Sequence, residues 1–246
     1  MKTFYRILLA IALLMPLLAH ATGYESLQVK AGRFYHYGEW PSALAMYQLM
    51  LDARPDEPST YCHAIVAAEL SDQRSEAVRL LGQSLEARVP LDSVFNGVRV
   101  LAFEQGDAVL YERFLEDTAE RYPWMKRNID ARFLDYYTWR RDGQGMVEYA
   151  TRMLTGLPDN VGYLTALADG YFTLGQDRHA VETYDKIIAL DPSNYHALLV
   201  LGNYYYDVRR QNRFDDAALE LARQYLSRAD TLHPTPYVTT LLSTLI

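Results

Sequence analysis

Residues 161–194 read VGYLTALADGYFTLGQDRHAVETYDKIIALDPSN, and the spacing within this stretch returns along the chain. Its apolar residues lie three and four positions apart, which is typical of one face of an α-helix. Gly175 interrupts the pattern, and Pro192 ends a second apolar run, because proline has no amide hydrogen with which to continue a helix. Small, turn and proline residues recur in a 34-residue register with one single-residue slip: Gly38, Asp72, Gly106 and Gly175; Ala43, Ala77 and Ala180; Pro55, Pro123 and Pro192.

A 34-residue period predicts stacked helix–turn–helix units, each of which completes its core against its neighbours. One unit carries the order large apolar, small, aromatic, glycine, alanine, aromatic and proline at Leu164, Ala168, Tyr171, Gly175, Ala180, Tyr184 and Pro192. This order resembles the tetratricopeptide-repeat family. The resemblance implies an all-α, right-handed α-solenoid, in which the first helix of each pair lines a concave groove for a partner.

The register divides residues 22–246 into one solenoid domain of six repeats and a cap. The slip falls in the fourth repeat, where the turn Arg140–Gln144 is expected to be one or two residues longer than the others. The sixth repeat is eight residues longer than the period, which equals about one extra turn on each of two helices. We expect repeats at 24–57, 58–91, 92–125, 126–160, 161–194 and 195–236, and a capping helix at 237–246.

The first 21 residues are typical of a cleaved signal peptide. Lys2 and Arg6 precede a short apolar run, and Ala19 and Ala21 provide the small residues before the cleavage point. We therefore expect an exported protein, periplasmic or secreted, with no membrane insertion after cleavage. The alternative is a segment retained as an anchor, although the run is shorter than the roughly 20 residues that span a bilayer.

Charge limits the classes of partner, and cysteine content limits the disulfide bonds that the chain can form. After cleavage the chain has 22 basic and 31 acidic residues, so its surface repels phosphate groups. Nucleic acid and anionic membrane are therefore not expected as partners. Cys62 is the single cysteine, which excludes an intrachain disulfide. We interpret it as a small buried apolar residue, and a reactive thiol or an intermolecular link is the alternative.

No pattern of catalytic residues is present in the sequence. It has no glycine-rich phosphate loop, no His-Glu-x-x-His helix and no Gly-x-Ser-x-Gly turn. The histidines are dispersed, and none of them pairs with another at helical spacing as a metal site requires. We expect no enzyme activity, no metal and no cofactor, and an envelope enzyme with an unrecognised site is the least favoured alternative.

The resemblance places binding residues on the first helix of each repeat. Its twelfth position is aromatic in five of six repeats, and aromatic side chains are frequent in binding hot spots. The competing interpretation is half-buried packing between adjacent repeats. The candidate groove residues are the rings Tyr35, Phe103, Tyr137, Phe172 and Tyr206, together with the polar side chains Asn96, Asp169 and Asn203.

The predicted function is that of a protein-binding scaffold or assembly factor of the cell envelope, with a partner polypeptide in the groove. The basic residues with which family members grip a terminal carboxylate are missing: Gln28, Gly32, Val66, Ser93 and Gly97 occupy those positions. A segment with apolar anchors therefore fits better. The alternative is a structural subunit that forms a homo-oligomer through its apolar end, Leu241 to Ile246.

Overall fold

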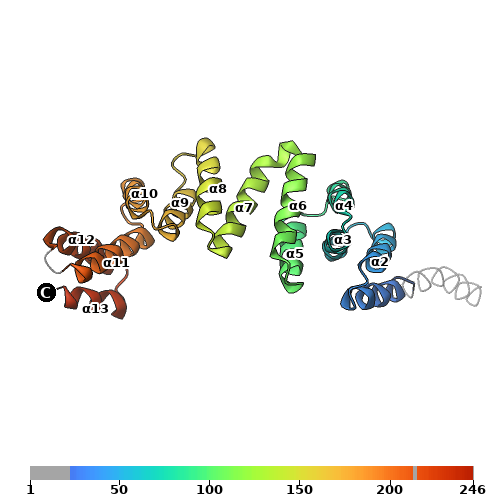
Figure 1. Ribbon diagram of the computed structural model, residues 1–246, viewed down its shortest axis with the longest axis horizontal. Helices are drawn as coiled ribbons and strands as arrows, with labels where there is room; N and C mark the ends of the chain where they lie inside the picture. The colour runs from blue at the N-terminus through green and yellow to red at the C-terminus, as the bar shows by residue number, and fades with distance from the viewer. Residues whose placement is uncertain (1–22, 213–214, 246) are drawn as a thin grey trace, which may run out of the picture. The chain divides into compact units, whose positions relative to one another are not determined.

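The computed structural model describes residues 23–212 and 215–245, which divide into two compact units after Met125. All regular elements of these residues are helices, so the predicted all-α class is confirmed (Figure 1). The boundary coincides with the predicted junction of the third and fourth repeats. Continuity of the two units as one domain stays a prediction. The signal segment 1–21 lies outside the described residues, so its cleavage and export also stay predictions.

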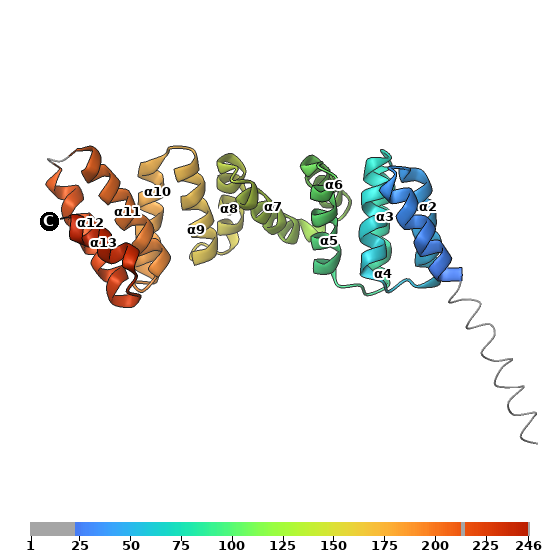
Figure 2. The ribbon, with the colours of Figure 1, turned by 90° about the horizontal axis from the view of Figure 1, so that it is seen from below.

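The described part of the first unit consists of helix pairs and a short 3-10 turn. α3 and α4 pack against each other as one such pair; they lie beside each other in Figure 1 and one in front of the other in Figure 2. Pro58 begins α3, at a position where a missing amide hydrogen breaks no helical bond. The elements are residues 23–36, α2 (Trp40–Ala53), α3 (Pro58–Leu70), α4 (Arg74–Glu86), α5 (Leu91–Glu104), α6 (Ala108–Arg121) and η1 (Pro123–Met125).

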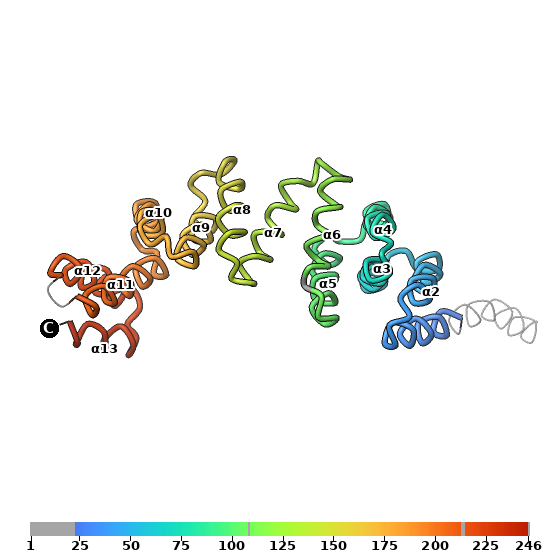
Figure 3. The backbone as a smooth tube through the Cα atoms, in the orientation of Figure 1, coloured from blue at the N-terminus to red at the C-terminus, as the bar shows by residue number. Residues whose placement is uncertain are grey.

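The second unit repeats the arrangement and ends with a single short helix. Its backbone reverses direction after each helix (Figure 3). Both helices of the last pair have 17 residues, against 14 in α2 and 13 in α3, which confirms the predicted extra turn. The elements are α7 (Lys126–Arg140), α8 (Gly143–Gly156), α9 (Val161–Thr173), α10 (Asp177–Leu190), α11 (Tyr195–Gln211), α12 (Asp216–Leu232) and α13 (Pro236–Thr244).

One left-handed residue ends the first helix in each of the first five repeats. In each turn the next amide also bonds to a carbonyl five residues back, as in Gln73 N to Ala68 O at 2.8 Å. This is the Schellman arrangement, which favours glycine because a side chain crowds the left-handed conformation. The left-handed residues that end these first helices are Gly38, Asp72, Gly106, Arg141 and Gly175, with φ between 54° and 73°; Arg88, after the second helix α4, also has positive φ, at 59°.

The fourth repeat corrects the predicted place of the slip. Its turn is short, because α7 ends at Arg140 and α8 begins at Gly143. Arg141 is the left-handed residue, 35 positions after Gly106 and 34 before Gly175. The extra residue therefore belongs to α7, which has 15 residues, and the predicted loose turn is wrong. Tyr137 lies four residues before the left-handed residue of its repeat, as Phe34 and Tyr171 do. The twelfth-position rings Tyr35, Phe103 and Phe172 lie three residues before theirs.

Replacing Arg141 with glycine should stabilise the second unit by about 0.5 kcal/mol. Relief of left-handed strain, about 1–2 kcal/mol, exceeds the about 0.5–1 kcal/mol that glycine loses in backbone entropy. The Ala131→Gly change, in the middle of α7, should instead cost about 1 kcal/mol. Urea unfolding of both variants tests this assignment. Destabilisation by Arg141→Gly would show that Arg141 is not the left-handed residue.

The last helix closes the second unit. Val238 and Leu245 are buried, and the half-buried Leu241 and Leu242 join them. They pack against Ala222 and Leu226 of α12 and against side chains of α11. Arg223 of α12 donates a hydrogen bond to the Leu245 carbonyl. The apolar side of α13 is therefore used inside the unit, as a cap requires.

Candidate binding surfaces

The five aromatic rings predicted to line the groove are all half-buried. None of them is fully exposed. Two are in the first unit, on residues 23–36 and α5, and three are in the second unit, on α7, α9 and α11. They are Tyr35, Phe103, Tyr137, Phe172 and Tyr206.

Tyr35 packs between its own helix, α2 and α3. The rings of Trp40 and His63 lie edge-on to it, with centroids 5.2 and 5.1 Å away. Its hydroxyl is buried and has no hydrogen-bond partner. Desolvation by burial raises the pKa of Tyr35, so the ring stays neutral. These contacts are those of interhelical packing.

Tyr137 lies within a stack of rings from α7 and α8. The centroids of Phe133 and Tyr149 are 6.1 and 5.5 Å from its own, with interplanar angles of 14° and 23°. Gly145 lies directly against the ring, and a Cβ there would overlap it. The sequence prediction placed Tyr137 one position away, because the slip inside α7 was not recognised.

Phe172 and Tyr206 connect neighbouring helices of the second unit. The Phe172 ring lies 6.0 Å from the ring of Tyr184 on α10 and 5.5 Å from that of Tyr204 on α11. The Tyr206 hydroxyl is 3.0 Å from the Thr244 hydroxyl at the end of α13. Both rings still keep part of their surface accessible to solvent.

Two of the predicted polar side chains form hydrogen bonds between helices. The Tyr184 hydroxyl donates to Asp169 on α9 and lies 3.2 Å from Nε2 of His196 on α11. Burial, and then the Asp169 carboxylate, raise the pKa of Tyr184. The Tyr237 hydroxyl donates to Asn203 Oδ1 over 3.0 Å. Asp169 and Asn203 therefore orient neighbouring side chains as well as meeting solvent.

The side chains of α9, α11 and α13 that make these contacts and reach solvent are called here the α9–α11 surface. Its side chains are polar or aromatic, and its helices α9, α11 and α13 occupy the place of first helices in successive repeats. The third predicted polar residue, Asn96, is exposed on α5 in the first unit. The α9–α11 surface comprises Asp169, Phe172, His196, Asn203, Tyr204 and Tyr237.

Glu69, at the twelfth position of the second repeat, is almost completely buried, at 3% exposure. Neither of its carboxylate oxygens has a hydrogen-bond partner among the described residues, and Arg113 Nε approaches only to 3.8 Å. Desolvation by burial outweighs the attraction of Arg113 and raises the pKa of Glu69 to about 7. Arg113 is shared with Asp107, 3.5 Å away, whose side chain caps α6. A group that titrates near neutral pH is thus built into the first unit.

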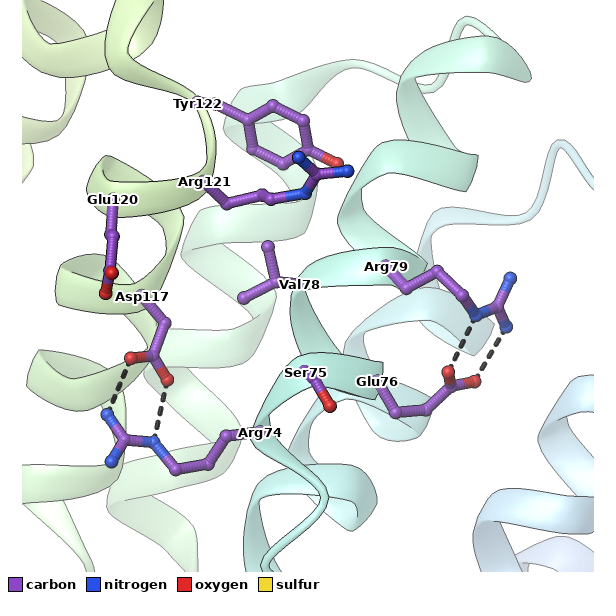
Figure 4. A pocket seen from close by; sticks show the side chains of 9 residues that line it. All are labelled: Arg74, Ser75, Glu76, Val78, Arg79, Asp117, Glu120, Arg121 and Tyr122. Atoms are coloured by element: carbon purple, nitrogen blue, oxygen red, sulfur yellow. Dashed lines mark hydrogen bonds and ion pairs between the residues drawn. The ribbon is translucent and has the colours of Figure 1, made fainter.

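A hollow on the second helices of the first unit was not predicted. Its volume is about 710 Å³, and it lies between α4 and α6 (Figure 4). Arg74 binds Asp117 through two hydrogen bonds of 2.7 and 2.6 Å, and Arg79 binds Glu76 through two of 2.7 Å. A second hollow of about 670 Å³ shares Arg79 and continues toward α2.

Arg121 and Tyr122 line both parts of this space. The Arg121 guanidinium lies 5.8 Å from the centre of the Tyr122 ring. The Tyr122 ring neighbours that of Trp124, at 6.3 Å. A Cβ at Gly82 would overlap the Tyr122 hydroxyl, so this glycine makes room for the ring. The residues come from separate repeats and share no sequence period, which is why the pattern did not predict them.

The described residues include no group of three or more histidine, cysteine, aspartate or glutamate side chains placed to hold a metal ion. Within residues 23–212 and 215–245, no helix is both long enough and apolar enough to cross a membrane. Cys62 is buried, as predicted, and desolvation raises the pKa of its thiol to about 11.

The order of helix pairs, with a left-handed residue closing the first helix in each of the first five repeats, decides the fold. The chain has a tetratricopeptide-repeat fold. No protein-family model matches the sequence, and a search of curated proteins finds no relative.

Solved structures similar to it include a putative protein binding protein from Bacteroides ovatus. That structure has a TM-score of 0.50 and 19% identity, over 77% of this chain and 96% of that one. The C-terminal part of a TPR repeat-containing protein from Cytophaga hutchinsonii has a TM-score of 0.44 and 13% identity, over 82% and 77% of the two chains. PilF of Pseudomonas aeruginosa has a TM-score of 0.46 and 12% identity, over 92% and 99%.

Proposed function

We propose that this protein is an exported, non-enzymatic scaffold of the cell envelope that holds a partner polypeptide against the first helices of its repeats. The observation that carries the proposal is the α9–α11 surface, where aromatic and polar side chains meet solvent on a rigid support. Rings fixed by neighbouring helices offer contact area at low entropic cost. The description of the Bacteroides ovatus structure as a putative protein binding protein supports the same class.

Self-association through the C-terminal end has less support. Val238 and Leu245 are buried against α11 and α12, so they are not available to a second copy. Tyr237 is the large apolar side chain of α13 that remains exposed, at 55%. It belongs to the α9–α11 surface, where it contacts Asn203.

Affinity capture from an extract of the source cell envelope tests the proposal. The bait is the full chain, tagged at its C-terminus, and its N-terminus after purification should be Thr22. The double variant His196→Ala with Tyr237→Ala removes two exposed side chains of the α9–α11 surface. It should reduce the recovery of the captured partner about tenfold or more, the scale of a binding hot spot.

The matched control is Arg178→Ala with Glu182→Ala, which removes an exposed ion pair from α10. It should leave capture unchanged, and circular dichroism should show native helix content in both variants. Equal recovery with both variants would contradict the proposal, as would capture of no protein by the unmodified bait.

A further inference from the structure

We propose that the hollow between α4 and α6 is a second docking site, which binds a single acidic side chain of a partner polypeptide through Arg121. The inference rests on the proposed scaffold function and assigns a second surface to it. It concerns the second helices of the first unit, whereas the α9–α11 surface belongs to first helices of the second unit.

Among the arginines that line this hollow, Arg121 is the one without a carboxylate partner in the described part of the chain. Of the three arginines that line it, Arg74 is held by Asp117 and Arg79 by Glu76, each through two short hydrogen bonds. Arg121 forms no ion pair with any residue of 23–212 or 215–245, although it lines the same hollow. Planar guanidinium groups bind carboxylates through two parallel bonds, so an incoming carboxylate would complete a third pair of the same kind.

The direction of the Arg121 side chain supports this assignment. Figure 4 shows it extending from α6 over Val78, with its guanidinium at the hydroxyl end of the Tyr122 ring and above both ion pairs in this view. The neighbouring Glu120 points its carboxylate away from that guanidinium. Glu120 also lines the hollow, but because its carboxylate is turned away, Arg121 is the charged group that faces this part of it.

The rings beside Arg121 offer apolar contact to residues that flank the acid. Trp124 is 71% exposed, which is unusual for the largest apolar side chain, and the Tyr122 ring is its neighbour. Tryptophan, tyrosine and arginine are the residue types most enriched in binding hot spots. A volume of about 710 Å³ lies within the range of typical ligand pockets.

The charges around the hollow exclude a run of acidic residues as its occupant. Asp52 and Glu86 line the far part of the hollow, toward α2. Residues 23–125 contain sixteen acidic and nine basic residues, so the whole first unit repels an acidic tract. A local ion pair survives that repulsion because charges more than about 8 Å away are largely screened at physiological salt. The occupant is thus one Asp or Glu flanked by apolar or aromatic residues.

The test uses an array of amidated nonapeptides with a central Glu and varied flanking residues, each paired with its Gln and Lys versions. The full-length protein is the probe. Peptides with Glu flanked by Phe, Leu or Tyr should bind at least about tenfold more tightly than their Gln versions, the scale of one charge-assisted pair. The Arg121→Gln variant should remove this preference and leave the Gln peptides unaffected.

The matched control is Arg33→Gln, which makes the same charge change at an exposed position of the first unit. It should retain the preference for Glu. A preference for Lys peptides, equal binding of Glu and Gln peptides, binding that requires a free terminal carboxylate, or equal behaviour of both variants would each overturn the inference. If capture of a partner depends on His196 and Tyr237 but not on Arg121, the proposed function holds and the inference about Arg121 does not.

Discussion

Replacing Glu69 with glutamine should stabilise the first unit by about 3 kcal/mol at pH 8. The carboxyl group is buried and accepts no hydrogen bond, so its ionised form lacks compensation for lost solvation. Burial raises the pKa of Glu69 from 4.5 to about 7. One pKa unit corresponds to about 1.4 kcal/mol, which gives about 3 kcal/mol for this difference. Glutamine keeps the shape and never ionises.

The pH dependence has a definite sign. Below pH 4.5 the carboxyl group is protonated in both states and contributes nothing to the difference. Between pH 4.5 and about 7 the unfolded chain ionises first, so the free energy of unfolding falls as the pH rises. Above that range the loss is complete and constant. The Glu69→Gln variant should lack this decline.

Urea unfolding of both proteins at several pH values measures the effect. The control is Glu116→Gln, since Glu116 is exposed on α6 and carries the same charge. It should follow the unmodified protein at every pH. Parallel curves for the unmodified protein and Glu69→Gln between pH 4.5 and pH 8 would show that Glu69 is ionised throughout, held by Arg113.

The helix pairs could be predicted because their turns leave a mark in the sequence. Gly38, Gly106 and Gly175 occupy left-handed positions, and glycine is the residue that enters them without strain. Arg141 occupies the same kind of position without being glycine. The sequence pattern therefore placed the single-residue slip at the turn that contains Gly143, just after Arg141. The structure shows that the extra residue lies in α7 instead.

The candidate sites were predictable only in part. First-helix positions follow from the register, and the structure places Asp169 and Phe172 on α9 and Asn203 on α11, both of them first helices. Their half-burial depends on which rings the next helix brings against them, and the period does not encode that. The hollow joins Arg121 of one repeat with Arg79 of another, an arrangement set by how α4 and α6 pack.

Replacing Tyr137 with alanine should destabilise the second unit by about 3 kcal/mol. Truncation of a packed aromatic ring to alanine costs about 3–5 kcal/mol, and the lower end applies because this ring is half-buried. Phe133 and Tyr149 would each lose a stacked neighbour. Gly145, which has no side chain, cannot fill the space that the ring leaves.

The matched control is Trp139→Ala, two positions further along α7, where the side chain is 59% exposed. It should change stability by less than about 1 kcal/mol, as surface substitutions do. Thermal and urea unfolding of both variants separate the two roles of an aromatic side chain. An unchanged unfolding midpoint for Tyr137→Ala would show that the ring is held for a ligand. A clear loss shows that it supports the helices, because a ring packed against Phe133 of α7 and Tyr149 of α8 stabilises this pair of helices whether or not a partner is bound.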